Sequence, residues 1–525
     1  MVKVEFALRE NYWENFQLGD EDIEYLYNRL LEVETPLTPQ EMLKELVNGR
    51  IQRELARMES QRNAGGELYM PQGQYQIGQE LLFPALNWQR GKVVGVRPGN
   101  NPDIGAFSVI SVTFPSGEQR EFAAEYPDHI LNNPPEVTHD ETFDTGFVLE
   151  TYGEDLLQVL QRGLMAHPDF VRIAGKWFAR ALLVDINVGH LNLAEAVLDM
   201  AGDDPLPTDE IISQIELTAN ANPKLLAFSL DLALQEDERF DEVGPAGEVL
   251  WHLRRLEPEA VLTPPVFLQY HAQEYDRRVL EPEMLALEQI LDDEHTPPLQ
   301  GNDLPGMVQL PLIFPHWRVG TLPLSTRVER IFPTAYESPR VRFTLVDGDD
   351  GSKFTGWVVR SHRYIYGLKD WYEKRGLIPG SIVSVRRGEQ PGEVIVEAKT
   401  QRYAKDWVRT MLIGSDGGIV FATLPQRINA EYDERMAVVI SDVEALDKLW
   451  QSGRYLHTPF ERVVVELTRQ LAKLTHQAHV HATELYAAVN LVRRCPPAPL
   501  LALLASRPWF VHVGDLYFRF DDSAR

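Results

Sequence analysis

The chain has 525 residues, of which 44% are hydrophobic and 25% charged, and its formal net charge is −27. This composition is that of an ordinary globular protein, and the length predicts about three to five domains rather than one core. No run of about eighteen apolar residues is present, and the first residues do not resemble a signal peptide, so we expect a cytoplasmic protein that does not bind membranes. Cys495 is the single cysteine, which excludes an internal disulfide and a cysteine-rich zinc site.

The charge is unevenly distributed along the chain. Residues 301–525 contain 29 Lys and Arg against 25 Asp and Glu, a balance of +4, whereas residues 1–300 contain 22 against 53, a balance of −31. Phosphate is repelled by the first part, so we expect any direct nucleic-acid contact in the second part. The acidic part is better suited to a basic protein surface.

The N-terminal part changes from a helical to a β pattern. Thr38 is followed by Pro39 and Glu41, which predicts a capping box at the start of a helix. Within residues 67–132, short apolar runs separated by turn residues predict an SH3-like barrel of about five strands. A helical pattern and a hairpin follow from residue 147, so we expect the barrel to be inserted in a helical module.

Three segments share a pattern in which a polar start to a helix precedes a two-strand wing closed by an aromatic residue. The wings are Phe170–Phe178, Phe240–Leu253 and Phe510–Phe518. Three matches in the same order are less easily accidental than one. The sequence therefore predicts a multidomain α+β protein in which three winged helix-turn-helix modules are interleaved with two small β-barrel domains.

The expected domain boundaries follow from turn residues, composition shifts and this repeat. In chain order they are 1–66 (helical part of the first winged helix), 67–132 (SH3-like barrel), 147–186 (last helix and wing of the first winged helix), 187–258 (second winged helix), 259–306 (helix and linker), 307–412 (basic pseudobarrel), 413–457 (mixed connector) and 458–525 (third winged helix).

The second module carries the most specific pattern. Asp237-Glu-Arg-Phe240, a glycine turn at Gly244 and Trp251-His-Leu253 follow a Pro-Leu segment that opens a helix. This pattern resembles the HARE-type winged helix, which occurs in the delta subunit of bacterial RNA polymerase, in restriction-endonuclease fusions and in chromatin proteins. The resemblance implies a bacterial protein that works with DNA or with the transcription machinery. The first and third modules lack the Asp-x-Arg-Phe signature.

A second resemblance covers part of the basic region. Gly356–Tyr364, Gly367–Tyr372 and the turn Leu377–Ser381 are similar to the pseudobarrel DNA-binding domain of plant transcription factors and of some restriction enzymes. The resemblance implies that this domain contacts DNA.

Residues 353–409 contain twelve basic and six acidic residues, with aromatic residues interleaved. Cations position a phosphate backbone, and aromatic rings stack on unpaired bases. The predicted nucleic-acid-binding residues are Lys353, Arg360, Arg363, Tyr364, Lys369, Arg386, Arg387 and Arg402, with Arg493 and Arg494 in the third module. The plainer alternative is a solvated strand edge whose aromatic residues belong to the core.

Two other patterns are weaker indications of a metal site or a catalytic site. His476, His479 and His481 lie close together, but no carboxylate or cysteine is placed to complete a tetrahedral site, so we expect no metal and no cofactor. Glu397 and Lys399 follow an apolar strand, as in metal-dependent nucleases, but residues 386–392 supply no Asp. We therefore predict no catalytic residue.

Together these observations predict a non-enzymatic protein that binds nucleic acid or RNA polymerase. DNA is expected on the basic barrel, and RNA polymerase or another protein on the acidic winged helices. Three alternatives stay open: a specificity or sensing subunit of a DNA-defence or modification-recognition system, a cryptic metal-dependent nuclease, and a protein-interaction scaffold.

Overall fold

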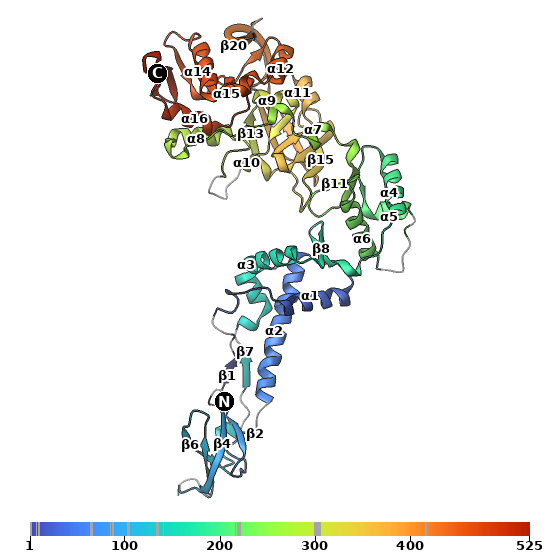
Figure 1. Cartoon of the computed structure of the whole chain (residues 1–525), viewed down its shortest axis with the longest axis vertical. Helices are drawn as coiled ribbons and strands as arrows, with labels where there is room; N and C mark the ends of the chain where they lie inside the picture. The colour runs from blue at the N-terminus through green and yellow to red at the C-terminus, as the bar shows by residue number, and fades with distance from the viewer. Residues whose placement is uncertain are drawn as a thin grey trace. The chain divides into compact units, whose positions relative to one another are not determined.

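The computed structural model (Figure 1) describes residues 3–6, 8, 11–63, 67–83, 86, 89–101, 105–132, 136–139, 141–215, 217, 222–298, 306–414 and 417–524. The chain is a mixed α/β protein with several sheets, including a half-barrel. It divides into two compact units, Met1–Asp185 with Ala219–Ser229 and Ile186–Thr218 with Leu230–Arg525. Every helix among the described residues is too short or too polar to cross a membrane.

The first unit begins with helices whose starts are fixed by side-chain caps. The predicted capping box is present: the Thr38 N–H donates to Glu41 at 2.8 Å, and the Glu41 N–H donates to Thr38 Oγ1 at 3.2 Å. Asp144 accepts a hydrogen bond from the Phe147 N–H at 2.7 Å and caps the third helix. The elements are α1 (Asp20–Val33), α2 (Pro39–Asn63), α3 (Thr145–Ala166), β8 (Phe170–Ile173) and β9 (Lys176–Ala179).

A five-stranded sheet lies between α2 and α3 in the chain, with the strand order β2-β3-β4-β5-β6. Apolar and aromatic side chains, including Leu81, Phe83, Val93 and Ile110, form its core. The chain then returns to α3, which packs against α2. The strands are β2 (Glu67–Leu68), β3 (Glu80–Phe83), β4 (Gln89–Pro98), β5 (Ser108–Thr113) and β6 (Gln119–Ala124), while β1 (Lys3–Phe6) pairs in parallel with β7 (Glu136–His139).

The second stretch of helices ends in a three-stranded sheet with the order β10-β12-β11. Trp251 anchors this sheet, because its buried indole N–H donates to the Asp231 carboxylate at 2.8 Å. The elements are α4 (Val188–Ala201), β10 (Leu206–Pro207), α5 (Thr208–Gln214), α6 (Pro223–Glu236), β11 (Phe240–Glu242) and β12 (Leu250–Leu253).

A seven-stranded sheet follows, with the order β13-β18-β19-β15-β16-β17-β14. Its apolar strands alternate inward and outward, as in β15, and bury a core with Trp371 and Tyr372. The strands are β13 (Met307–Pro311), β14 (Thr321–Pro323), β15 (Arg340–Asp347), β16 (Lys353–Val359), β17 (Tyr364–Tyr366), β18 (Ile382–Arg387) and β19 (Glu393–Glu397). The accompanying helices are α7 (Glu259–Leu262), α8 (Pro282–Leu291), α9 (Phe314–Val319), α10 (Thr326–Glu329) and α11 (Lys369–Arg375).

The C-terminal part starts with the long hairpin of β20 (Thr400–Ile413) and β21 (Ile419–Ala430), so the predicted boundary at residue 412 falls inside a strand. The chain ends in a three-stranded sheet with the order β23-β25-β24. The remaining elements are β22 (Val439–Ile440), α12 (Val443–Gln451), α13 (Arg454–His457), α14 (Phe460–Ala472), β23 (His479–His481), α15 (Ala482–Val492), α16 (Pro497–Ser506), β24 (Phe510–Gly514) and β25 (Tyr517–Phe520).

One order of elements occurs three times: a helix, a short extended segment, two helices and a hairpin. In each case the extended segment pairs with the second strand of the hairpin. The pairs are Leu37 with Trp177 in β9, β10 with β12, and β23 with β25. We call these stretches the first, second and third modules, which comprise α1–α3 with β8–β9, α4–α6 with β10–β12, and α14–α16 with β23–β25.

Candidate functional site

Three of the predicted nucleic-acid-binding cations are paired with carboxylates of the same chain. The ammonium of Lys353 lies 2.5 Å from Glu393, and the guanidinium of Arg386 lies 2.9 Å from Glu397. Lys369 pairs with Glu373, one turn later on α11, at 3.3 Å. Each of these charges is therefore balanced locally, which weakens the field that a phosphate backbone would meet.

Two further predicted cations rest on backbone carbonyls. Arg360 Nη1 donates to the carbonyl of Ser338 at 2.7 Å, and Arg387 Nε donates to that of Arg330 at 3.2 Å. Arg363 is half-buried and has a left-handed backbone with φ of 55°. The side chain of Arg402 lies outside the described residues.

Three other cations of the basic region also face carboxylates. Lys374 lies 2.6 Å from Asp350, and Arg375 Nη2 lies 2.5 Å from Asp347. Arg409 Nη2 lies 2.6 Å from Glu484. The net positive charge counted along residues 353–409 is therefore offset by acids from other parts of the fold, which the local count does not include.

Most aromatic side chains of this region belong to the core. Tyr364 is 1% exposed, and its hydroxyl donates to the carbonyl of Ala260. Burial raises the pKa of Tyr364 to about 12. Trp357, Trp371 and Tyr372 are buried as well. The prediction that Tyr364 contacts nucleic acid is wrong, because a buried ring has no face open to a base. Trp407 differs, since it is 72% exposed on β20.

The prediction that Arg493 and Arg494 contact nucleic acid is also wrong, because both side chains are buried. Arg493 Nη1 donates to the carbonyl of Thr458 at 3.1 Å, and its guanidinium lies over the ring of Phe460 at 5.5 Å. Arg494 is fully buried and pairs with Asp293 at 2.6 Å and with Glu294 at 2.7 Å. Neither arginine presents a cation to an external phosphate.

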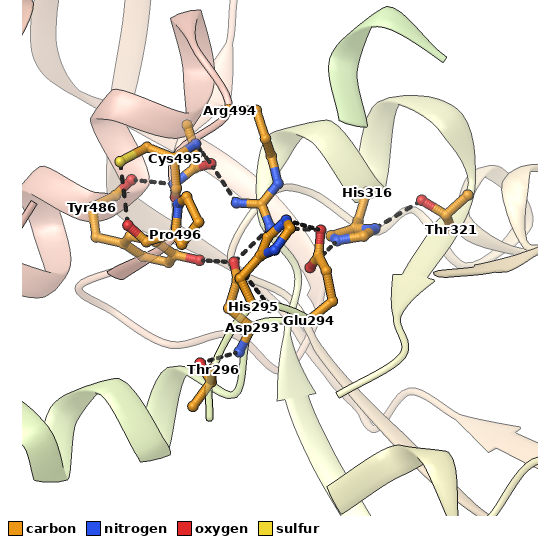
Figure 2. Close-up of polar contacts among 11 residues, drawn as sticks. Asp293, Glu294, His295, Thr296, His316, Thr321, Tyr486, Arg494, Cys495 and Pro496 are labelled. Atoms are coloured by element: carbon orange, nitrogen blue, oxygen red, sulfur yellow. Dashed lines mark hydrogen bonds and ion pairs between the residues drawn. The ribbon is translucent and has the colours of Figure 1, made fainter. Parts of the chain in front are cut away.

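Arg494 is the centre of a buried polar cluster (Figure 2). Tyr486 donates its hydroxyl hydrogen to Asp293 at 2.9 Å, and the His316 ring lies 3.3 Å from Glu294 and 2.8 Å from Thr321. Burial alone would raise the pKa of Glu294, but Arg494 and His316 hold that pKa well below its usual range. The cluster joins the segment after α8, helix α9 and the third module by charge-assisted hydrogen bonds.

The same cluster includes the one group among the described residues whose spacing fits a metal ion: Asp293, Glu294 and His295. The donor set is suitable for a cation, but Arg494 already lies within hydrogen-bonding distance of both carboxylates. A metal would have to displace a buried guanidinium that has no other carboxylate partner in the described cluster. The group therefore fits an internal ion-pair network better than a metal centre.

The sequence did not single out Asp293, Glu294 or His316, and residues 259–306 were predicted to be a helix and a linker. The sequence did carry an indication of this ion pair on the arginine side. Arg493 and Arg494 interrupt an apolar stretch that continues into α16, and an arginine inside such a stretch needs a buried acid. The identity of that acid could not be read from the sequence, because Asp293 lies 201 positions away.

The two weaker chemical patterns do not assemble sites. Glu397 holds Arg386, and Lys399 lies 3.5 Å from Glu431, so the nuclease pair is engaged with other residues. His481 is buried and accepts a hydrogen bond from the Thr483 N–H at 3.1 Å, as the cap of α15. Burial lowers the pKa of His481 to about 4. This histidine is a capping residue.

The second module presents a different surface. Residues 187–258 contain fifteen acidic and four basic residues, a balance of −11. Arg239, from the Asp-x-Arg-Phe pattern, is held by Asp237 at 2.8 Å and by Glu195 at 2.6 Å. Its side-chain hydrogen bond to Asp237, followed by the one to Glu195, raises the pKa of the guanidinium. The signature arginine thus links the wing to α4.

Comparisons with known proteins give no neighbour for this chain. No family model matches it, and neither a curated protein nor a solved structure is similar to it.

Proposed function

We propose that the chain is a non-catalytic interaction protein built from winged-helix modules, which binds a protein partner such as RNA polymerase through its acidic surfaces. The observation that carries the proposal is the internal pairing of the basic region. Lys353, Lys369, Arg386 and Arg409 each face a carboxylate of this chain, which lowers the positive charge that the region offers to phosphate.

The last helices of the first and third modules favour a protein partner over DNA. In helix-turn-helix proteins that bind DNA, one helix enters the major groove with polar and basic side chains. Helix α3 instead exposes Glu150, Glu154 and Asp155. Helix α16 is buried in the core around Leu500 and Leu504. Neither helix has the charge or exposure that groove binding requires.

Affinity purification from native cells, with and without nuclease treatment, tests this proposal. Retention of RNA polymerase subunits or of another defined protein after nuclease treatment is the expected result. If every associated protein is lost with the nucleic acid, the acidic modules do not hold a protein partner and the proposal fails.

A second candidate function is binding of single-stranded nucleic acid by the β20–β21 hairpin. It is favoured by the exposure of Trp407, since tryptophan rings are rarely left open to solvent without a use. Trp407→Ala should weaken a mobility shift with single-stranded DNA and leave the duplex unaffected. Reversing the charge of Arg360, Arg363, Arg386 and Arg387 tests the sheet surface separately. A shift that survives both changes places any nucleic-acid contact elsewhere.

A further inference from the structure

Helix α4 of the second module carries apolar side chains on its exposed face. Leu193 is 51% exposed and Met200 is 78% exposed, and Gly189 and Ala196 lie on the same side of the helix and are exposed too. The opposite side of α4 is buried through Leu191, Ala194, Val197 and Leu198. Helix α4 is therefore apolar on its core side and again along this outer stripe.

The outer stripe forms a single straight row of side chains. Positions 189, 193, 196 and 200 are separated by four, three and four residues, which keeps them on one line of a helix surface. Rows of this kind form the ridges and grooves through which one helix packs against another. The row is one side chain wide, which suits the ridge of a partner helix better than a broad flat surface.

The negative charge around the stripe favours a partner that carries positive charge. Residues 187–258 have a balance of −11, and Asp199, Asp203 and Asp204 lie at the end of α4 or just beyond it. Arg255 faces Asp199 and Arg342 lies 3.5 Å from Asp204, so these two carboxylates are partly compensated and the net negative charge comes from the other acids. The C-terminal end of a helix also carries partial negative charge. The exposed acids on neighbouring α5 are Asp209 and Glu210. A cation is therefore favoured along the end of the stripe where Met200 lies.

We propose that this face of α4, defined by Gly189, Leu193, Ala196 and Met200, docks a basic amphipathic helix of a protein partner. The inference rests on the proposed function as a protein-binding chain and adds the site and the kind of ligand. Apolar side chains of the partner meet Leu193 and Met200, and its lysines or arginines face the acids beyond Met200. This is the helix-in-groove mode of recognition.

The test uses the full chain and a labelled synthetic helix of leucine and lysine in amphipathic order. Binding is followed by fluorescence anisotropy and compared with a leucine and glutamate peptide and with a lysine peptide of scrambled order. Leu193→Asp with Met200→Asp should weaken binding of the basic amphipathic peptide at least about tenfold, because the two largest anchors are lost. The matched control is Met165→Asp with Ile290→Asp, which changes two residues of similar exposure, 63% and 66%, on α3 and α8.

Equal affinity in the α4 variant and the control, or equal binding of the acidic peptide, overturns the inference. Sedimentation gives a separate check: a dimer that Leu193→Asp dissociates shows that a second copy covers the stripe, and this also overturns the inference. Thermal melting confirms that both variants fold. If polymerase subunits remain bound to the α4 variant after nuclease treatment, the docking site is wrong while the proposed function stands.

Discussion

The second and third modules have the same order of elements but opposite surroundings. Arg239, directly before β11 of the second module, has a side chain that is 32% exposed and pairs with Glu195 and Asp237 at the surface. Arg494, between α15 and α16 of the third module, is fully buried between Asp293 and Glu294. One topology therefore serves as an outward-facing unit in one case and as an internal support in the other.

This difference explains why the two arginines in the sequence of the third module did not mark an exposed basic surface. In the third module α16 packs against α8 within one core, so the helix and the preceding arginines are occupied by the chain itself. In the second module α4 leaves Leu193 and Met200 uncovered. What decides the role of each module is the part of the chain that packs on it.

The largest expected effect comes from Arg494. Arg494→Met leaves the carboxylates of Asp293 and Glu294 buried without their cation, and we expect a loss of about 3–5 kcal/mol in the free energy of unfolding. Urea unfolding of the full chain, followed by tryptophan fluorescence, measures it. Arg239→Met is the matched control and should cost less than about 1 kcal/mol, because its ion pairs are partly solvated. Equal losses would remove the contrast between the modules.

The pH dependence of stability should differ between the modules as well. Burial lowers the pKa of His481 in the third module to about 4, so protonation opposes folding. Its stabilising contribution of about 3 kcal/mol is present above about pH 6.5 and is lost as the pH falls towards 4. His481→Asn keeps a capping acceptor and removes the titration, so acid unfolding should move to lower pH. An unchanged acid midpoint would mean that His481 is accessible to protons in the folded state.

Glu242 of the second module titrates in the opposite sense. Burial raises the pKa of its carboxyl to about 8, which favours the protonated form in the folded chain. Its contribution is therefore present below about pH 4.5 and is lost as the pH rises through 8. Glu242→Gln should flatten the loss of stability on the alkaline side and leave the acid side, to which His481 contributes, unchanged.

The sequence predicted the local elements better than their long-range partners. The capping box at Thr38, the three hairpins and the helix that became α8 follow from short-range patterns, and all are present. The predicted α+β class is confirmed as far as a mixed α/β protein with several sheets, and the count of winged-helix and barrel modules stays a prediction. Whether a predicted nucleic-acid-binding cation is free to meet phosphate depends on acids that lie far from it in the chain. Arg494 and Asp293, or Arg409 and Glu484, meet only after folding, and no periodicity reports such a pair.

A smaller effect is expected from the buried hydrogen bonds that fix the second wing. Asp231 accepts from the Trp251 indole and from the Thr208 hydroxyl, and both donors are buried. Asp231→Ala leaves them without this acceptor and should cost about 1–3 kcal/mol. Near-ultraviolet circular dichroism of the tryptophans and urea unfolding measure the change. Trp251→Phe in the same background should add little if the lost indole bond dominates.

The smallest effect is expected from Arg255, which pairs with Asp199 on α4 with both side chains about half exposed. An exposed pair of this kind contributes less than about 1 kcal/mol and is screened by salt. Arg255→Gln should therefore barely change unfolding, yet it removes a cation beside the docking face of α4. If that face takes a basic helix, the same substitution should tighten binding of the leucine and lysine peptide at low salt and have no effect at high salt. Weaker binding would show instead that Arg255 contacts the ligand, and would reverse the charge assigned to the partner.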